Sequence, residues 1–308
     1  MNSSLPPDPL GPLDPLPRRP LPALVIDLLR QVEATARAAQ IEWFVGGASA
    51  RDILLTHVYG IEATRATADV DIGVNVESWT GHAALKQALV ASGTFEQRGE
   101  THRLYYRDPT NGELMWLDIV PFGGLEGDTG NAPSARPSGA SEISWPPDHA
   151  VRMNVAGFAE ALAHAVSVRV AADLTVPVAS LPGQAMLKIV AWHDRHASDR
   201  KDATDLLFLL ASYSAAGNQD RLYGDAYDLV ERYDHQLELA GAALLGRDTA
   251  AIVSAPTREL ITRVLEPGQD YPRILEHMMG HRARIFEQTP AFTEAAFHAF
   301  REAFVAPR

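Results

Sequence analysis

The feature that most constrains this fold is a glycine pair followed by two aspartates on an apolar segment. The sequence FVGGASARDILL predicts a short strand that ends at Gly46-Gly47 and then a helix over residues 48–57. Further along, ADVDIGV places Asp69 and Asp71 two positions apart within an apolar strand. Side chains two positions apart on a strand point to the same face. The chain is therefore predicted to form a strand, a turn, a helix and a second strand that presents two carboxylates together.

Both halves of this pattern suit phosphate and metal chemistry. Paired carboxylates bind hard divalent cations such as Mg²⁺, and two-metal sites hold their ions about 3.5–4 Å apart. The missing side chains of Gly46 and Gly47 let backbone N–H groups approach phosphate oxygens, and Ser49 adds a hydroxyl. Taken alone, a glycine pair is an ordinary turn and a D-x-D segment is a solvated strand end. The two in this order favour a site for a metal and a phosphate.

A third acid is expected on a neighbouring strand, and Asp118 in the segment MWLDIVPF is the candidate. Alternation places Asp118 on one face with Trp116, opposite Leu117 and Ile119, so the acid needs a partner there. A metal shared with the two earlier aspartates would supply it, and Asp118 would ligate one ion and help deprotonate a hydroxyl group. The alternative is an edge-strand acid that faces water. Arg103, which begins an adjacent strand, could reach this site, but a solvated strand residue is the default expectation.

The sequence divides into three parts. Residues 1–22 contain eight prolines and are expected to form an extended or disordered tail that does not pack. Residues 23–180 mix helix and strand patterns, whereas residues 181–308 are almost purely helical in pattern. The segment 123–148 is expected to be a long loop, and Trp145 within it favours a lid or edge that packs down. The other predicted elements are a helix from about residue 23, a strand over 70–76, a hairpin of strands 104–107 and 114–120 with a turn at 108–112, and helices over 82–92, 185–196, 199–213, 222–245, 249–265, 271–287 and 291–304.

Composition excludes several classes of protein. There are no cysteines, so disulfides, thiolate metal sites and cysteine nucleophiles are excluded, and a reducing cytoplasm fits. The 39 acidic residues against 27 basic ones give a net charge of −12, which argues against a general nucleic-acid coating protein but permits a local basic groove. No apolar run is long enough to cross a membrane, and the N-terminus lacks the basic start and apolar core of a signal peptide.

Basic residues in the helical part are candidates to complete the site. Lys188 interrupts the apolar pattern AMLKIVAW, and Arg195 lies seven residues later on the same helix face. Arg200 and Lys201 begin the next predicted helix. Lys188, Arg195 and Lys201 are predicted to bind a triphosphate or an acceptor phosphate. The alternative for Lys201 is an ion pair with Asp205 on a solvated helix face.

These motifs resemble a known family. VGGASARDILL followed by TADVDIGV is similar to the nucleotidyltransferase superfamily, and most similar to AbiEii/AbiGii-type nucleotidyltransferases, the toxins of type IV toxin–antitoxin systems and their stand-alone relatives. The segments LDIVPFGG, SLPGQAMLKIVAWHDR and RKDATDLLFLL extend the resemblance over residues 44–213. It implies an α+β fold in which a polymerase-beta-like mixed-sheet domain precedes an α-helical domain. It also implies metal binding by Asp69, Asp71 and Asp118 and a phosphate-binding turn at Gly46, Gly47 and Ser49.

Two departures set this chain apart from the superfamily pattern. A serine usually follows the first glycine directly, whereas here Gly47 takes that place and Ser49 comes later. The spacing of 22 residues from Gly47 to Asp69 is also longer than usual, which predicts an inserted connector over residues 57–67. The head domains of tRNA CCA-adding enzymes and bacterial poly(A) polymerases share a similar GG…RD…LL run, but they carry an arginine-rich motif that this chain lacks.

The resemblance implies Mg²⁺-dependent transfer of a nucleoside monophosphate from an NTP to a hydroxyl group of tRNA or protein, with two Mg²⁺ ions and release of pyrophosphate. The biological role it implies is that of a cytoplasmic toxin held in check by an antitoxin protein. Two alternatives stay open: a nucleotide-binding sensor or interaction module without activity, and a small-molecule nucleotidyltransferase of the antibiotic-modifying kind. All three acids are present, which favours an enzyme, because a module that only binds needs no candidate base.

Overall fold

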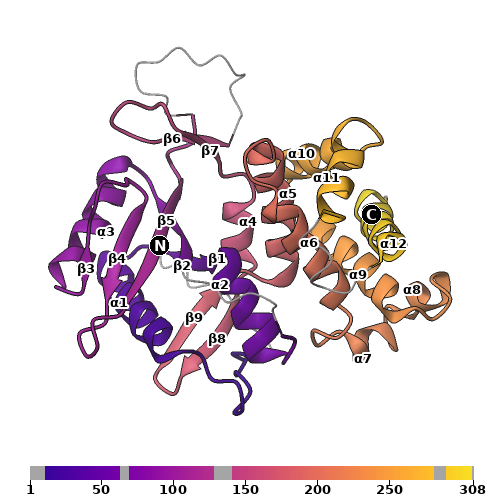
Figure 1. Cartoon of the computed structure of the whole chain (residues 1–308), viewed down its shortest axis with the longest axis horizontal. Helices are drawn as coiled ribbons and strands as arrows, with labels where there is room; N and C mark the ends of the chain where they lie inside the picture. Colours follow the sequence, from indigo (N-terminus) through magenta and orange to yellow (C-terminus); the bar gives the residue numbers. More distant parts are fainter. Residues whose placement is uncertain (1–10, 63–68, 128–140, 281–288, 307–308) are drawn as a thin grey trace. The chain divides into compact units, whose positions relative to one another are not determined.

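The computed structural model describes residues 11–62, 69–127, 141–280 and 289–306. The chain divides into two compact units, one of residues 1–60 and 65–180 and the other of residues 61–64 and 181–308. The first unit contains a mixed sheet with helices, and the described residues of the second unit form helices (Figure 1). The prediction of an α+β fold with a mixed sheet followed by helices is therefore confirmed.

The main sheet of the first unit has the strand order β3-β4-β5-β2-β1-β9-β8. The pairs β2/β5 and β1/β9 are parallel, and the other neighbouring pairs are antiparallel. The predicted strand over 70–76 and the predicted hairpin are confirmed, whereas the last two strands of the unit were not predicted. The strands are β1 (Trp43–Gly46), β2 (Asp69–Val76), β3 (Phe95–Glu96), β4 (Arg103–Arg107), β5 (Leu114–Gly123), β8 (Val166–Ala171) and β9 (Leu174–Val178).

One face of this sheet points into the core, because side chains alternate along each strand. Ile72 of β2 is 1 % exposed on this face. Trp43 of β1, on the same face, donates its indole N–H to Glu33 of helix α1 (Ala23–Ala39) over 3.0 Å. Helix α3 (Trp79–Ala91) packs beside α1. The sheet is thus anchored from this side, and the opposite face is left for the aspartates.

The opposite face of β2 carries the aspartates at one end and meets an aromatic cluster at the other. The rings of Phe44, Phe122 and Phe158 lie 6.0, 5.8 and 5.7 Å apart in pairs. Phe158 begins helix α4 (Phe158–Ala163), which contacts β1, β2 and β5. A Cβ on Gly73 would lie 2.4 Å from the Phe44 ring, so a glycine is needed for this ring to rest on the sheet. The cluster fixes three strands relative to one another next to the predicted site.

The helix predicted over residues 48–57 is present in two parts. Helix α2 (Gly47–Arg51) follows directly from β1, and a π-helical segment η1 (Asp52–Val58) continues it. The two together end just before Gly60, as predicted. Of the connector expected over 57–67, residues 57–62 are described, with 57 and 58 in η1, and residues 63–67 lie outside the described residues, which resume at Asp69.

Part of the segment predicted as a loop forms a separate small hairpin of strands β6 (Glu142–Ser144) and β7 (Arg152–Asn154). Trp145, directly after β6, is 6 % exposed and holds this hairpin against α3 and the start of β4 in the same unit. Residues 128–140 lie outside the described residues. The ring partners of Trp145 are Trp79 and His82 of α3, at 5.3 and 5.8 Å, and His102 beside β4, at 5.8 Å.

Residues 11–22 pack against the first unit, in contrast to the unpacked tail expected from their prolines. Leu13 forms a parallel β-bridge with Val168, and its N–H donates to the carbonyl oxygen of Ser167 over 2.8 Å. Leu21 is buried at 5 % exposure. Proline removes a donor only at its own position, so the residues between prolines still pair with a strand. The expectation of no packing is therefore wrong for residues 11–22, and residues 1–10 lie outside the described part.

In the second unit, helix α9 packs against α5, α6 and α12. A Cβ on Gly246 of α9 would lie 2.2 Å from the carbonyl oxygen of Phe300 in α12, so this glycine allows the two helices to cross closely. None of the helices in the described part of the chain combines the length and apolar character that a membrane crossing requires. The helices of this unit are α5 (Leu181–Arg195), α6 (Lys201–Ser212), α7 (Gln219–Leu222), α8 (Tyr227–Arg232), α9 (Leu237–Ile252), α10 (Ala255–Leu265), α11 (Asp270–Met278) and α12 (Pro290–Val305).

Two of the predicted helices are divided, and the helix predicted over 271–287 ends in α11 at Met278, with residues 281–287 outside the described part. The single helix predicted over 222–245 is interrupted, because Asp234 and His235 have φ of +50° and +60° and end α8 before α9 begins. The helix predicted over 249–265 is also divided, since α9 ends at Ile252 and α10 starts afresh with Pro256 in its first turn. Apolar periodicity continued through both breaks and so did not reveal them.

We predict that His82 makes the stability of the protein sensitive to acid. Burial, with a smaller effect of the Lys86 charge, lowers the pKa of His82 from 6.5 to about 4. A neutral buried imidazole stabilises the fold above pH 6.5, and this contribution is lost as the pH falls from 6.5 towards 4, up to roughly 3 kcal/mol. Urea unfolding between pH 7.5 and 4.5 measures the loss, and His82→Gln should flatten the slope.

The control for this experiment is His164→Gln, which removes one exposed imidazole from the same unit. It should leave the acid slope of the wild-type protein in place. An unchanged slope in His82→Gln would show that the acid sensitivity has another source.

Candidate active site

Residues that lie directly opposite one another on four neighbouring strands of the main sheet form the predicted site; we call this row of residues the register line. Asp71 lies opposite Asp118 in the parallel pair β2/β5, and opposite Gly46 in the antiparallel pair β1/β2. Arg103 lies opposite Asp118 in the antiparallel pair β4/β5. From β4 to β1 the line therefore reads Arg103, Asp118, Asp71 and Gly46. Registered neighbours point to the same face, so this line puts a base, two acids and the glycine turn side by side.

The three predicted carboxylates converge. Asp69, Asp71 and Asp118 each offer a carboxylate oxygen, and these oxygens lie within 4.8 Å of one another. All three residues are half-buried, where solvent screens their mutual repulsion less than at an open surface. A donor set made only of carboxylate oxygens suits Mg²⁺ or Mn²⁺. The residues present therefore fit the divalent metal that the sequence predicts.

Gly47 is required by the position of Asp71. Its φ is +59°, a region that residues with a side chain rarely adopt, and a Cβ here would lie 1.9 Å from Asp71 Oδ2. Gly46 differs, because its φ is −117° and its added Cβ would meet nothing closer than 3.5 Å. The second glycine of the pair therefore gives the Asp71 carboxylate its place, whereas the first is compatible with a side chain.

Ser49, the predicted hydroxyl donor to phosphate, has a partner within the protein. Its Oγ–H donates to the backbone carbonyl oxygen of Asp69 over 2.6 Å, and the residue is 8 % exposed. This bond ties helix α2 to the first residue of β2 and so helps to position Asp69. The phosphate contact of Ser49 stays a prediction.

Arg103 is a base that contacts the carboxylate cluster directly. Its Nε donates to Asp118 Oδ1 over 2.6 Å and its Nη2 to Asp118 Oδ2 over 2.7 Å, which is the bidentate geometry of a strong charge-assisted pair. The guanidinium also lies over the Trp116 ring, 5.2 Å from its centroid. The hydrogen bonds to Asp118, and the charges of Asp118 and Asp69, outweigh burial and raise the pKa of Arg103 above its ordinary value.

The default expectation of a solvated Arg103 is wrong and the alternative, that it reaches the acids, is confirmed, since its side chain is 24 % exposed and paired with Asp118. The signal that could have found the pair is the turn at 108–112. With that turn, Arg107 pairs with Leu114, and counting back along both strands brings Arg103 opposite Asp118. The register of the hairpin therefore already indicated that Arg103 is the partner of Asp118.

Lys188, a predicted triphosphate ligand, lies in a buried ion network of the second unit. Its Nζ is 3.1 Å from Asp202 Oδ1 and 2.5 Å from Asp205 Oδ2. Arg195 adds a bidentate pair to Asp202, with Nε–Oδ2 at 2.7 Å and Nη2–Oδ1 at 2.9 Å. Burial alone would lower the pKa of Lys188, but Asp205 and Asp202 outweigh it and hold that pKa above its ordinary value. The network ties α5 to α6.

Lys201 lies at the start of α6 and is exposed. Its Nζ is 3.2 Å from Asp199 Oδ2. Asp199 Oδ1 also accepts from the backbone N–H of Lys201 over 3.0 Å, and Asp199 lies one residue before Arg200, the N-cap of this helix. The nucleotide contacts of Lys188, Arg195 and Lys201 stay predictions. Within the second unit, Lys188 and Arg195 are paired with Asp202, and Lys201 is paired with Asp199.

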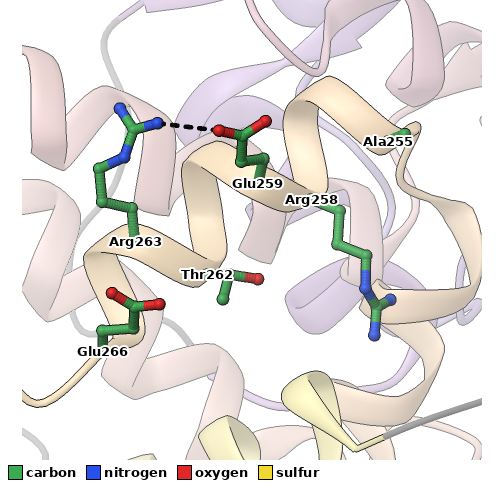
Figure 2. Close-up of a pocket in the computed structure, with 6 residues that line it drawn as sticks. All are labelled: Ala255, Arg258, Glu259, Thr262, Arg263 and Glu266. Atoms are coloured by element: carbon green, nitrogen blue, oxygen red, sulfur yellow. Dashed lines mark hydrogen bonds and ion pairs between the residues drawn. The ribbon is translucent and has the colours of Figure 1, made fainter.

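A surface groove along α10 is a further concave site in the second unit (Figure 2). Arg263 pairs there with Glu259 over 3.2 Å, and Arg258 donates to the carbonyl oxygens of Ala250 and Phe304. Arg263 thus forms an ion pair on the surface of α10, and Arg258 binds backbone oxygens at the ends of α9 and α12. The groove is lined by Ala255, Arg258, Glu259, Thr262, Arg263 and Glu266.

Comparison with known proteins agrees with the chemistry of the carboxylate site. The family model described as "Nucleotidyl transferase AbiEii toxin, Type IV TA system" matches residues 27–304. The chain belongs to this family. As an AbiEii-family protein, it is a nucleotidyltransferase.

The AbiEii-family chain was also compared with curated proteins and with solved structures. A search of curated proteins finds no match. Among solved structures, the chain is similar to one titled "Solution Structure of Antibiotic-Resistance Factor ANT(2'')-Ia Reveals Substrate-Regulated Conformation Dynamics". The identity is 15 %, the match covers 70 % of this chain and 99 % of that chain, and the TM-score is 0.33.

We predict that Gly47→Ala and Gly46→Ala differ in their effect on stability. Gly47→Ala should cost about 1–3 kcal/mol of unfolding free energy, because the new Cβ strains the backbone and overlaps the Asp71 carboxylate. Gly46→Ala should stay within about 0.5 kcal/mol of the wild type, because its backbone is extended and space is present. Urea unfolding at pH 7.5 measures both. Equal losses would contradict the assignment of the left-handed turn to Gly47.

We also predict that Lys188 is needed for the stability of the helical unit. Lys188→Met should lower the unfolding free energy by about 3–5 kcal/mol, because it leaves Asp202 and Asp205 without one of their buried partners. Lys201→Met is the matched control, and should cost at most about 1 kcal/mol because the Lys201–Asp199 pair is exposed. Chemical denaturation followed by circular dichroism measures both. A Lys188→Met protein as stable as the control would leave Lys188 without a structural role.

Proposed function

We propose that this AbiEii-family chain transfers a nucleoside monophosphate from an NTP to a hydroxyl group, with Mg²⁺ bound by Asp69, Asp71 and Asp118. The observation that supports this most is the convergence of three carboxylate oxygens within 4.8 Å of one another, beside the turn that seats Asp71. When bound, two Mg²⁺ ions would offset the charge of the triphosphate and lower the cost of ionising the attacking hydroxyl.

The reaction forms one bond and breaks another at the α-phosphorus. The acceptor oxygen bonds to this phosphorus, the bond from it to the bridging oxygen breaks, and pyrophosphate leaves. The hydroxyl proton passes to Asp118. Arg103 donates one hydrogen bond to each oxygen of Asp118, and the second lone pair of each oxygen could still accept this proton. Backbone N–H groups at Gly46 and Gly47 would bind the triphosphate.

The bases of the second unit would bind phosphate by exchanging partners. Lys188 and Arg195 are paired with acids of α6, and Lys201 is paired with Asp199. We propose that Lys188 contacts the triphosphate, and that Arg195 and Lys201 contact the triphosphate or a phosphate of the acceptor.

The proposed acceptor is a hydroxyl group of tRNA or of a protein, and the proposed role is growth inhibition controlled by an antitoxin. Membership of a toxin family supports this role. The net charge of −12 disfavours extended contact with RNA. It permits binding of a tRNA end, because few phosphates are contacted there and a local basic region is enough.

We predict that label transfer depends on the carboxylate cluster. The purified protein is incubated with each α-³²P-labelled NTP, Mg²⁺, and total RNA, cell protein or small hydroxyl compounds. Asp71→Asn should lower the rate by about 100-fold or more, because a ligand of the metal is lost. Asp108→Asn, in the exposed turn of the β4/β5 hairpin, is the matched control and should keep wild-type activity.

The position of the label separates the candidate acceptors. Label on RNA supports a tRNA-directed enzyme, label on protein supports nucleotidylation of side chains, and label on a small hydroxyl compound supports the antibiotic-modifying alternative. Tight NTP binding with no label on any acceptor would contradict the proposed transfer and support a sensor. Growth arrest on expression, abolished by Asp69→Ala, would support the toxin role, and growth that is unaffected by the wild type would contradict it.

A further inference from the structure

Arg103 donates a hydrogen bond to each oxygen of Asp118, which is one of the proposed metal ligands. Its two donors take Asp118 Oδ1 at 2.6 Å and Oδ2 at 2.7 Å, and the side chains are only 24 % and 13 % exposed. The guanidinium also lies over the Trp116 ring, 5.2 Å from its centroid. The pair is therefore an ordered contact of the sheet and differs from a mobile surface ion pair.

The position of this pair gives it an electrostatic role in the site. The three carboxylates have oxygens within 4.8 Å of one another, and like charges at this distance repel strongly. Arg103 neutralises one of the three and lies at the end of the register line that runs through Asp118 and Asp71. A divalent cation in the cluster would neutralise the same charges from the other side. Arg103 and the cation would therefore compete electrostatically for the charge of the same acid.

We propose that Arg103 is a positioning residue that competes with divalent cations for Asp118. This inference rests on the proposed function, because it takes Asp118 as a metal ligand. Arg103 holds the Asp118 carboxylate in the orientation that faces Asp71, and it opposes a second positive charge beside it. When a cation binds, Arg103 gives up at least one hydrogen bond to Asp118, and the freed N–H group serves a phosphate oxygen of the nucleotide.

This competition makes the nucleotide and the metal bind cooperatively. An NTP brings oxygens for the cation and an anionic partner for the displaced guanidinium, so each ligand favours the other. A free cation gains neither and binds weakly. The substitution of Arg103 by a neutral residue removes the competitor, and its effect is therefore an increase in the affinity for the cation alone.

The test measures Mn²⁺ binding to the purified protein without nucleotide, by the loss of the free-ion signal in electron paramagnetic resonance. Arg103→Gln should bind Mn²⁺ about tenfold more tightly than the wild type, because one positive charge next to the site is gone. Arg107→Gln is the matched control. Arg107 lies on the same face of β4, and its partner is the exposed Glu96 at 3.1 Å. Its substitution should leave the Mn²⁺ affinity within about twofold of the wild type.

Each outcome decides the inference. Mn²⁺ binding by Arg103→Gln that is unchanged or weaker overturns it. If Arg103→Gln does not fold, Arg103→Lys replaces it: a lysine keeps the charge but loses the bidentate geometry, so Mn²⁺ affinity should rise by a smaller factor, and no rise overturns the inference. Asp71→Asn separates the two proposals. Wild-type Mn²⁺ binding that survives Asp71→Asn overturns the metal site itself, whereas binding lost in Asp71→Asn but unchanged in Arg103→Gln overturns the role of Arg103 alone.

Discussion

The whole candidate site depends on two acids placed directly opposite each other on neighbouring parallel strands. Asp71 and Asp118 share one register position of β2 and β5. Like charges directly opposite across a sheet are destabilising, so this position must be held by the rest of the fold. Ile72 and Ile119, each next to its aspartate, are 1 % and 0 % exposed and fix the strands from the core side. Arg103 continues the same line and neutralises part of the charge. Burial of the apolar face of the sheet thus stabilises an arrangement that the repulsion between Asp71 and Asp118 on the polar face destabilises.

The glycine turn belongs to the same arrangement. Gly46 pairs with Asp71 across β1 and β2, and a side chain on Gly47 would occupy the space of the Asp71 carboxylate. The sequence predicts space for a phosphate at this turn, and the structure adds a second need for space, that of the acid itself. Ser49 then fixes the backbone at Asp69. The turn and the carboxylates are therefore one packed unit, in which the proposed metal ligands are positioned by the same residues that would meet the triphosphate.

The parts of this structure that the sequence predicted are those that local patterns encode. Alternation along β2 and β5 gave the faces of their aspartates, and the turn at 108–112 gave the hairpin. The unpredicted parts depend on partners far away in the sequence. Leu13 pairs with Val168, and nothing in either segment alone indicates the other. Lys188 was recognised as unusual within an apolar helix, but its acidic partners come from the next helix. Residue type and spacing indicated which side chains matter, whereas register and packing decided what each one touches.

The bases that the proposed function needs are already paired with acids of the protein, and this pairing affects which ligand can bind them. Arg103 is paired with Asp118, and Lys188 is paired with Asp202 and Asp205, each pair within its own unit. A bare anion that approaches such a base must leave a carboxylate uncompensated in a half-buried or buried place, which is costly. For the Arg103–Asp118 pair, a nucleotide that arrives with divalent cations would supply both replacements under the proposed function, because its phosphate would pair with the base and its cation with the acid. In a chain with a net charge of −12, this exchange favours a metal–nucleotide complex over free phosphate without requiring any unpaired positive charge in the resting protein.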